Sequence, residues 1–402
     1  MPGFLPFRAL RYAAGTDFSA VIAPPYDVLS EADVDDLAAR DAHNIVAIDV
    51  PRGGDDRYAV AARTLQDWLA EGVLVVDDQP AFTIYRMRFT DSTGTPRTIV
   101  GVLGGLEVVD LDAGGVLPHE RTTPKAVTDR LDLTRATATN LSPVWGLSLA
   151  RGLTEALAAP GEVVGAMTTE GVDHVVERVT DLARIAEISA ILAADDVLIA
   201  DGHHRYAISR TYRDEVRAAT GRRNTLAEYT LTFVNELVDD QLSIEAIHRV
   251  YTNICLDELR ANLSGSFDLE PAPAPSPELL ADMVALGRLV LLAQDGTAQW
   301  LIPKPGAFTG VRELDGAYLE HALAGSRAEV GYQHGLDETV ALVTSQQVNA
   351  GILIRPTSLA EIQRTAREGL LMPPKSTFFT PKLRTGFVIR PTEPLPSLSS
   401  RL

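Results

Sequence analysis

The stretch from residue 196 to residue 216 limits the fold more than any other part of the sequence. Its first five residues, Asp-Val-Leu-Ile-Ala, form an apolar run of strand length. Beyond it, His204, Ile208, Tyr212 and Val216 recur at four-residue steps, which is typical of one face of a helix. Gly202 lies between the two patterns, where glycine permits a backbone turn with positive φ. The sequence therefore predicts a buried strand that turns sharply into a helix.

The residues of this turn also favour anion binding. The unpaired N–H groups and the positive dipole end of a new helix attract phosphate or carboxylate. Arg205, in the first turn, adds a charged fork of donors. Asp201 is expected either to cap the helix or to handle a metal ion or a proton. In the alternative interpretation, Asp201 is the cap, Gly202 is the turn residue, and His203 and His204 are partly buried surface groups.

The composition is that of a soluble globular protein with room for two domains. The chain has 402 residues, of which 46% are hydrophobic and 22% are charged. Its formal net charge of −18 argues against broad binding to nucleic acid or anionic membrane, because such a field repels polyphosphate backbones. A small anionic ligand remains compatible with this charge if basic residues converge locally.

Cysteine content and hydropathy indicate a cytoplasmic location. Cys255 is the only cysteine, so no internal disulfide can form, and we expect it to be a small buried side chain. The first residues do not resemble a secretory signal. No segment reaches the roughly 20 apolar residues needed to span a bilayer.

A dense polar segment between Pro118 and Pro143 is the second candidate for function. It carries His119, Glu120, Arg121, Thr122, Thr123, Lys125, Asp129, Arg130, Asn140 and Ser142. A solvated helix and loop would explain it, yet the same mixture suits a phosphate-handling site. A zincin motif is excluded because Thr123 stands where the second histidine is needed. There is no P-loop and no protein-kinase signature.

Periodicity and turn residues predict several further elements. Prolines at every second position of 270–277 predict an extended linker or surface excursion. The alternation over 227–237 predicts a half-buried strand. The other expected elements are helices that begin after Ser30 and over 55–71, 181–194 and 358–369, hairpins over 82–103 and 288–302, and a last strand over 387–390.

Four ordered boxes carry a resemblance to a known family. They are Phe7-Arg8-Ala9 with Pro24-Pro25-Tyr26-Asp27, His119-Glu120-x-Thr122 with Asp129-Arg130, Ala200-Asp201-Gly202-His203-His204-Arg205-Tyr206, and Met372-Pro373-Pro374-Lys375-Ser376-Thr377. With them the chain resembles, over almost its full length, a widespread bacterial family of formerly uncharacterised proteins. The core of the third box is similar to that of the archaeal ADP-dependent free-serine kinase and of the ParB/sulfiredoxin-like nucleotide-binding fold.

The resemblance implies an α+β fold and a kinase activity. The implied parts are an N-terminal α/β segment over 1–110, a ParB/sulfiredoxin-like nucleotide-binding catalytic domain with a mixed sheet over 111–255, and a smaller α/β domain over 256–402. The implied reaction transfers a phosphoryl group from ATP or ADP, with Mg²⁺, to the hydroxyl of free L-serine, and gives O-phospho-L-serine.

The boxes supply hypothetical roles for individual residues. We expect the catalytic residues to be Glu120 as general base, Asp201 as Mg²⁺ ligand or partner of a histidine, and His204 as a donor to phosphate. The residues expected to hold the nucleotide phosphates are Gly202, His203, Arg205, Lys125 and Arg130. Those expected to bind the acceptor are His119, Thr122, Lys375 and Ser376. For His204, packing above Ile208 is the alternative, and for Lys375 and Ser376 the alternative is a plain structural loop.

Two other functions compete with the kinase. One is a non-enzymatic, nucleotide-binding regulator of ParB-like type that uses the same phosphate site. The other is a DNA-binding protein, which the negative charge and the lack of a basic helix disfavour. A homodimer is compatible with the sequence.

Overall fold

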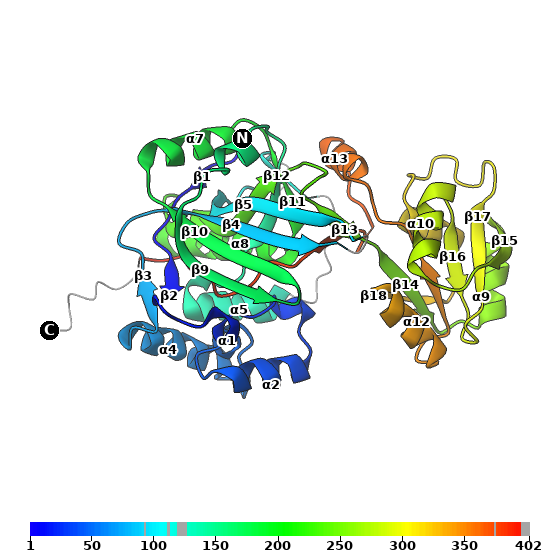
Figure 1. Cartoon of the computed structure of the whole chain (residues 1–402), viewed down its shortest axis with the longest axis horizontal. Helices are drawn as coiled ribbons and strands as arrows, with labels where there is room; N and C mark the ends of the chain where they lie inside the picture. The colour runs from blue at the N-terminus through cyan, green and yellow to red at the C-terminus, as the bar shows by residue number, and fades with distance from the viewer. Residues whose placement is uncertain (92–93, 111–112, 119–126, 374, 395–402) are drawn as a thin grey trace. The chain divides into compact units, whose positions relative to one another are not determined.

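The computed structural model describes residues 1–91, 94–110, 113–118, 127–373 and 375–394. Its contacts divide the chain into two units, which are described separately below (Figure 1). The first unit comprises Met1–Ser243 and Pro381–Leu402, and the second comprises Ile244–Thr380. The second unit is therefore an insertion, after which the chain returns to the first. The three-part division of the sequence at 110/111 and 255/256 stays a prediction.

A mixed sheet forms the centre of the first unit. In the described residues its strands are β1 (Phe4–Leu5), β4 (Phe82–Thr90), β5 (Pro96–Glu107), β6 (Val116–Leu117), β8 (Val144–Ser148), β9 (Glu162–Thr169), β10 (Val172–Val179), β11 (Val197–Asp201) and β12 (Tyr229–Glu236). Their order is β6-β11-β8-β12-β5-β4-β10-β9, with β1 paired to β5. The β6–β11 and β8–β12 pairs are parallel, and the other pairs are antiparallel.

Helices and short strands surround this sheet. The described helices of the first unit are α1 (Phe18–Val21), α2 (Glu31–Arg40), α3 (Val46–Asp49), α4 (Arg57–Ala70), α5 (Val127–Thr137), α6 (Leu153–Ala156), α7 (Leu182–Leu192) and α8 (His203–Thr220), with 3₁₀ turns η1 (Tyr26–Val28) and η3 (Leu226–Glu228). The short strands are β2 (Leu10–Tyr12), β3 (Leu74–Val76), β7 (Thr139–Asn140) and β21 (Arg390–Pro391). Side chains of α6 and α7 pack on the sheet in one apolar core, whereas α5 and α8 share another apolar cluster.

Many predicted local elements are present. Ser30 caps α2 in a capping box with Asp33, and Gly72, with a φ of 77°, follows the end of α4. The first predicted hairpin is the antiparallel β4–β5 pair. The expected α+β class is confirmed as a mixed α/β protein with one large mixed sheet and a second, antiparallel sheet. Its assignment to the ParB/sulfiredoxin-like fold stays a prediction.

Strand β12 differs from the expected half-buried strand. Every residue from Thr230 to Glu236 is buried, including Thr232 on the face that was expected to be polar. The reason is the position of β12 inside the sheet, between β8 and β5. Alternation of threonine with apolar residues therefore does not indicate an exposed face here, because threonine is also well suited to buried strands.

The second unit is built on an antiparallel sheet of its own. Its described strands are β14 (Ile247–Thr252), β15 (Phe267–Ala272), β16 (Leu289–Leu292), β17 (Ala298–Pro303), β18 (Glu329–His334) and β19 (Ala350–Leu353), in the order β15-β17-β16-β19-β14-β18. A separate short pair joins β13 (Ser243–Glu245) to β20 (Phe378–Thr380). The described helices are α9 (Leu256–Leu263), α10 (Pro277–Leu286), α11 (Asp315–Ala322), α12 (Leu336–Thr344) and α13 (Leu359–Arg367).

The structure excludes one of the two alternatives for the proline-rich segment and corrects the expectation for Cys255. The segment is extended and lies at the surface, as the second alternative expected, but it is not a linker, since Pro271 lies in β15 opposite Gln299 of β17. Strand β15 is at the edge of the sheet, where a residue without an N–H is tolerated. Cys255 is exposed rather than buried, because it lies at the N-cap position of α9.

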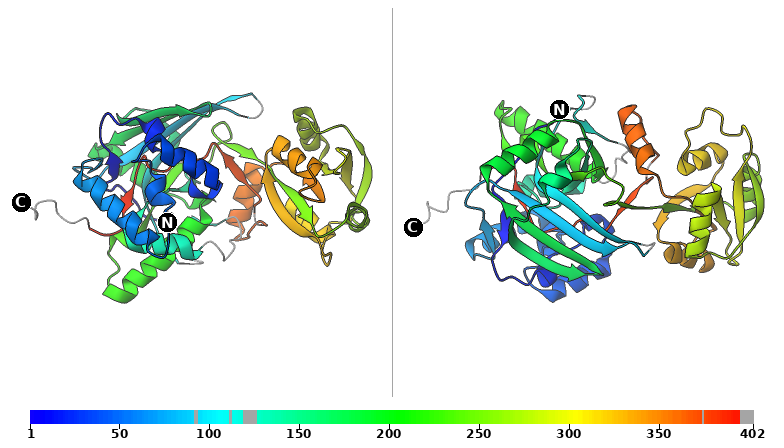
Figure 2. Two further views of the ribbon diagram at one scale, coloured as in Figure 1. Left: turned by 90° about the horizontal axis from the view of Figure 1, so that it is seen from below. Right: turned by 45° about the horizontal axis from the view of Figure 1, so that its top comes forward.

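After the second unit, residues 381–394 pass back through the first unit (Figure 2). Thr385 forms a bridge with Ala23, and Ile389 forms one with Leu10. The following two residues make up β21, which pairs with β7. This is shorter than the strand expected over 387–390. The return segment therefore contacts parts of the first unit that are more than 200 positions earlier in the sequence.

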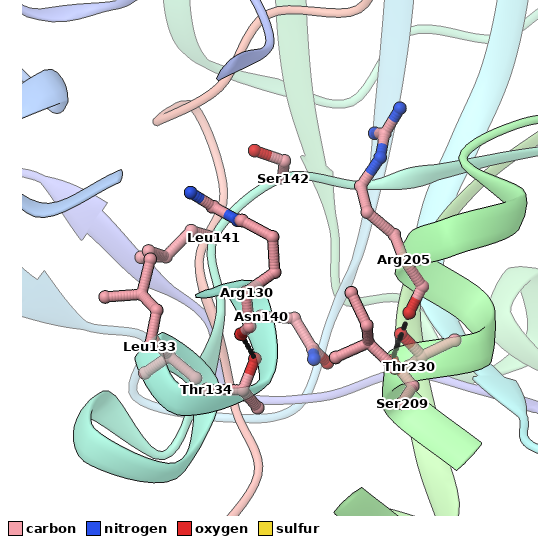
Figure 3. Close-up of a pocket in the computed structure, with 11 residues that line it drawn as sticks. Arg130, Leu133, Thr134, Asn140, Leu141, Ser142, Arg205, Ser209 and Thr230 are labelled. Atoms are coloured by element: carbon pink, nitrogen blue, oxygen red, sulfur yellow. Dashed lines mark hydrogen bonds between the residues drawn. The ribbon is translucent and has the colours of Figure 1, made fainter. Parts of the chain in front are cut away.

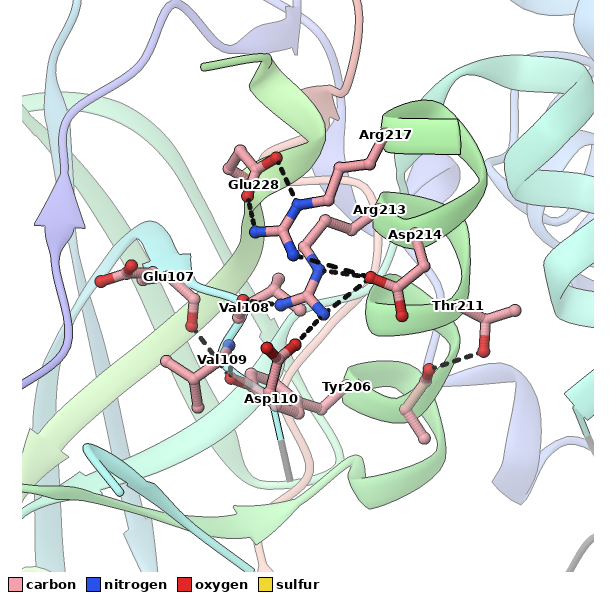
Figure 4. A network of polar contacts seen from close by, with 11 residues as sticks. Glu107, Val108, Val109, Asp110, Tyr206, Thr211, Arg213, Asp214, Arg217 and Glu228 are labelled. Carbon is pink, nitrogen blue, oxygen red and sulfur yellow. Dashed lines mark hydrogen bonds and ion pairs between the residues drawn. The ribbon is translucent and has the colours of Figure 1, made fainter. Parts of the chain in front are cut away.

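A buried arginine ties α8 to the end of β5. The side chain of Arg213 is 1% exposed and donates to the carbonyl oxygen of Val108 and to Asp110, as well as to Asp214 (Figure 4). One turn later, Arg217 pairs with Glu228. These contacts fix the orientation of α8 on the sheet, and hence the position of its first turn. Among the described residues, no helix is long and apolar enough to cross a membrane.

His174 makes the stability of the first unit depend on pH. It is fully buried on β10, and its Nδ1 lies 2.8 Å from the hydroxyl of Tyr85. Burial, with help from Arg384 nearby, lowers the pKa of His174 to about 3. An unfolded histidine has a pKa near about 6.5, so the unfolded state binds the proton first as the pH falls. The contribution of His174 to the free energy of unfolding is therefore complete above about pH 6.5 and is lost progressively as the pH falls toward about pH 3.

We expect the free energy of unfolding to fall when the pH is lowered from 7 to 5. This fall should be about 2 kcal/mol larger in the wild type than in a His174→Leu variant. Urea unfolding of both proteins at the two pH values measures this difference. Comparison between variants removes the contributions of other groups, such as His248. Equal losses in the two proteins would contradict the assignment of the pH dependence to His174.

Candidate functional site

The predicted strand–turn–helix is present at the centre of the site. Strand β11 ends at Asp201, Gly202 has a φ of 86°, and α8 begins at His203. A Cβ atom at position 202 would also lie 3.0 Å from the guanidinium carbon of Arg205. Glycine is therefore favoured by the left-handed backbone, and a side chain at this position would press against the guanidinium of Arg205. The N-cap residue is Gly202, so the expectation that Asp201 caps the helix is wrong.

The carboxylate of Asp201 instead pairs with two positively charged side chains. One carboxylate oxygen, Oδ1, lies 2.8 Å from Nζ of Lys382, and Oδ2 lies 2.5 Å from Nη2 of Arg205. Burial alone would raise the pKa of Asp201, but Lys382 and Arg205 outweigh it and hold this pKa well below its usual value. Arg205 also donates to the carbonyl oxygen of Pro143. The guanidinium of Arg205 is thus fixed from two sides.

Arg130 is fixed in a similar way by a different carboxylate. Its guanidinium donates to both the backbone oxygen and the side chain of Asp49, which is 1% exposed. It also lies over the ring of Tyr26, 4.0 Å from the ring centroid. Ser142 lies 3.5 Å from the Asp49 carboxylate and 2.8 Å from the hydroxyl of Thr385. Asp49 and Tyr26 therefore orient Arg130 directly, and Ser142 contributes through its position beside Asp49.

The two arginines line one pocket, shown in Figure 3. The pocket is a partly open depression, and its empty space is about 400 Å³ only when the adjoining open solvent is included. Its lining residues are Arg130, Leu133, Thr134, Thr139, Asn140, Leu141, Ser142, Arg205, Ile208, Ser209 and Thr230. The charged side chains in this lining are those of Arg130 and Arg205. Their guanidinium groups suit phosphate or carboxylate oxygens.

Charge around the pocket is almost balanced in the described residues. Arg130, Arg205 and Lys382 face two carboxylates, the buried Asp49 and the half-buried Asp201. Burial lowers the pKa of Arg205, but Asp201 and, less strongly, the exposed carboxylate of Asp27 raise it, and together they outweigh burial. A ligand with several negative charges therefore needs additional positive charge, from other residues or from a bound cation.

Several predicted site residues cannot be placed. His119, Glu120, Thr122 and Lys125 lie outside the described residues. The neighbouring Asp129 is on α5, where it accepts a hydrogen bond from the hydroxyl of Tyr58.

His203 and His204 begin α8 and are half-buried. His203 is near enough to Asp201 to contribute, as a minor cause, to the lowered pKa of that carboxyl. His204 is the next residue of the same first turn.

Lys375 and Ser376 belong to the second unit. The hydroxyl of Ser376 is buried and donates to the carbonyl oxygen of Pro373 at 2.7 Å. The carbonyl oxygen of Lys375 accepts from Arg249 at 3.0 Å. These contacts hold the loop, which agrees with its alternative interpretation as a structural element. Substrate contact by either residue stays a prediction.

Asp201 does not fit the expected role of Mg²⁺ ligand. Both of its oxygens already accept from cations, and Mg²⁺ prefers free oxygen ligands in an octahedral arrangement. Nor does any group of three or more histidine, cysteine or carboxylate side chains suitable for a metal occur in the described residues.

Sequence reasoning missed three residues that shape the site. Tyr26 is within a quoted box, so its box membership was a usable signal. Lys382 offers a cationic donor a few residues after the last box, although its partner Asp201 is 181 positions away, whereas Asp49 had no such signal, since its partner Arg130 is 81 positions away.

Comparison with known proteins gives one clear family and several distant structural likenesses. A family described as a protein of unknown function (DUF1015) matches residues 4–317. Free serine kinase in complex with AMP has 13% identity and a TM-score of 0.38, and the match covers 71% of this chain and 92% of that chain. A variant of free serine kinase in complex with ADP gives 13% and 0.39, with 71% and 92% covered.

Two further similar structures come from named organisms. C-terminally truncated SbnI from Staphylococcus aureus has 14% identity and a TM-score of 0.39, with 72% of this chain and 87% of that chain covered. A conserved hypothetical protein from Pyrococcus furiosus has 11% identity and a TM-score of 0.40, with 72% and 95% covered. No curated protein matches the sequence. Likenesses at these identities and TM-scores do not transfer an activity.

Proposed function

The chain belongs to the DUF1015 family, and from this premise we propose that it is a small-molecule kinase that phosphorylates free L-serine to O-phospho-L-serine. The observation that carries the proposal is the pocket shared by Arg130 and Arg205. These residues come from two separate sequence boxes, both of which were expected to bind phosphate. Phosphoryl transfer asks a protein mainly for positioning and charge neutralisation, and two oriented guanidinium groups supply both.

In the proposed complex, the phosphates of ATP or ADP lie against Arg130, Arg205 and the first turn of α8. The left-handed Gly202 allows close approach of the ligand to the backbone, and His203 is at the start of the helix. Lys125 would add the further positive charge that the balanced pocket needs. Asp201 acts on the ligand indirectly, because it holds Arg205 and Lys382 in place.

Mg²⁺, when it accompanies the nucleotide, neutralises phosphate charge and takes most of its ligands from phosphate oxygens and water. Asp201, whose oxygens are paired with Arg205 and Lys382, is not among the proposed ligands of this ion.

The acceptor side of the proposal rests on the sequence boxes. Glu120 is the proposed general base toward the serine hydroxyl, and His204 is a proposed donor to a phosphate oxygen. His119, Thr122, Lys375 and Ser376 are the proposed contacts to the amino acid.

One observation favours a second function, a nucleotide-binding regulator without catalysis. The described lining of the pocket contains no carboxylate and no histidine, and both of its arginines are already paired with carboxylates, Arg130 with Asp49 and Arg205 with Asp201. Such a site could bind a nucleotide tightly without providing a general base.

The two functions differ in whether a product forms. Purified full-length protein is incubated with L-serine, Mg²⁺ and either ATP or ADP, and O-phospho-L-serine is measured by mass spectrometry. We expect its formation with at least one of the two nucleotides. Nucleotide binding without product would contradict the kinase and support the regulator.

A further inference from the structure

Asn140 is a pocket residue whose amide has a fixed orientation. It lies on β7, opposite Arg390 of β21. Its Oδ1 accepts from the backbone N–H of Leu231 at 3.1 Å and from Nη1 of Arg390 at 3.3 Å. Both partners can only donate, because neither a backbone N–H nor a guanidinium has an acceptor atom. The oxygen of the amide is therefore the atom that faces Leu231 and Arg390.

The amide nitrogen must then face the other way. Asn140 is half-buried and lines the same pocket as Arg130 and Arg205, as Figure 3 shows. Within the described part of the chain, its Nδ2 makes no hydrogen bond. Two N–H donors of a rigidly held side chain are thus left for a pocket ligand.

The hydroxyl groups around Asn140 are already engaged. Thr134 donates to the carbonyl oxygen of Arg130 at 2.8 Å, and Ser209 bonds to the carbonyl oxygen of Arg205 and to the hydroxyl of Thr230. The polar groups of this lining that remain for hydrogen bonds to a ligand are mainly the N–H donors of the two guanidinium groups and of Asn140. A lining of donors selects a ligand with several acceptor oxygens.

We propose that Nδ2 of Asn140 donates to an anionic oxygen of the ligand bound between Arg130 and Arg205. The inference rests on the proposed function for the identity of that ligand. The oxygen belongs either to a nucleotide phosphate or to the carboxylate of the amino acid, which share the same chemistry at this donor. Asn140 would thereby distinguish anionic ligands from neutral ligands of similar size.

The substitution Asn140→Asp tests this directly. Aspartate has the same shape and keeps an oxygen for Leu231 and Arg390, so the fold should persist. In the pocket it replaces two donors by a negatively charged acceptor. The matched control is Asn224→Asp, which adds the same charge at an exposed position of the first unit. Asn140→Ser is a second, uncharged variant, which serves if the aspartate variant does not fold.

Isothermal titration with ADP and, separately, with L-serine measures the effect on each ligand. We expect Asn140→Asp to weaken at least one of them by about 10-fold or more, as loss of a charge-assisted hydrogen bond does. Asn140→Ser should have a smaller effect in the same direction, and Asn224→Asp should bind like the wild type. Weaker ADP binding assigns the donor to phosphate, whereas weaker serine binding assigns it to carboxylate.

Unchanged binding of both ligands by a folded Asn140→Asp or Asn140→Ser variant would overturn the inference, as would a wild type that binds neither. Failure of the kinase proposal is distinguishable from this result. If the wild type binds ADP but makes no phosphoserine, and Asn140→Asp loses ADP, the inference stands without the kinase. If the variant makes phosphoserine with wild-type constants, the kinase stands without the inference.

Discussion

Replacing Arg205 with methionine is expected to weaken ADP binding by about 100-fold or more. Methionine keeps much of the apolar length of the side chain but removes every donor. A hydrogen bond to a charged group contributes about 1.5–3 kcal/mol, and two of them to phosphate oxygens would account for the loss. Isothermal titration of ADP into wild type and variant measures the effect.

The matched control is Arg210→Met, since Arg210 lies on the same helix but does not line the pocket. This control should bind ADP with an affinity close to that of the wild type. Thermal unfolding of Arg205→Met, compared with that of Arg210→Met, reports whether the fold stays stable when Asp201 has lost its pairing with Arg205 and keeps that with Lys382. A folded Arg205→Met variant with wild-type affinity would remove Arg205 from the nucleotide site.

The second large effect is expected from Glu120→Gln. This change keeps the shape of the side chain but removes the base, so we expect turnover to fall by roughly 10²–10⁴-fold. ADP affinity should stay within about 3-fold, because the phosphates are assigned to other residues. Phosphoserine formation under saturating nucleotide and serine measures turnover.

Asp129→Asn and Asp132→Asn are the controls, because Asp129 and Asp132 are the other two acidic residues of the sequence between Pro118 and Pro143. The structure places both on α5 in contacts with neighbouring side chains, Asp129 with Tyr58 and Asp132 with Arg135. We expect each to retain turnover within about 3-fold. Loss of turnover in either control, with normal turnover in Glu120→Gln, would reassign the base.

Local sequence patterns were sufficient where the structure depends on neighbours along the chain. The apolar run before Asp201, the glycine at 202 and the four-residue periodicity after it predicted β11, the turn and α8. Patterns failed where burial depends on distant partners. Strand β12 is buried because β5 and β8 flank it, and Pro271 is tolerated because β15 lies at a sheet edge.

In the candidate site too, local sequence patterns predicted some residues, whereas others depend on partners that are distant in the sequence. The boxes identified Arg130 and Arg205, which the structure brings to one pocket. They also contain Asp201 and Tyr26, which contact these arginines, but they did not identify Asp49, which holds Arg130, or Asn140, which completes the lining. Asp49 acts across 81 positions, and Asn140 is fixed by an arginine 250 positions later. The first contact joins distant parts of the first unit, and the second forms only when the return segment packs into that unit, so no local pattern encodes either.

A crystal structure of the full-length protein with bound ADP tests the central claim most directly. The account predicts that the phosphates lie between the guanidinium groups of Arg130 and Arg205, within hydrogen-bonding distance of both and next to the first turn of α8. ADP phosphates bound away from both arginines, with the pocket unchanged, would contradict it.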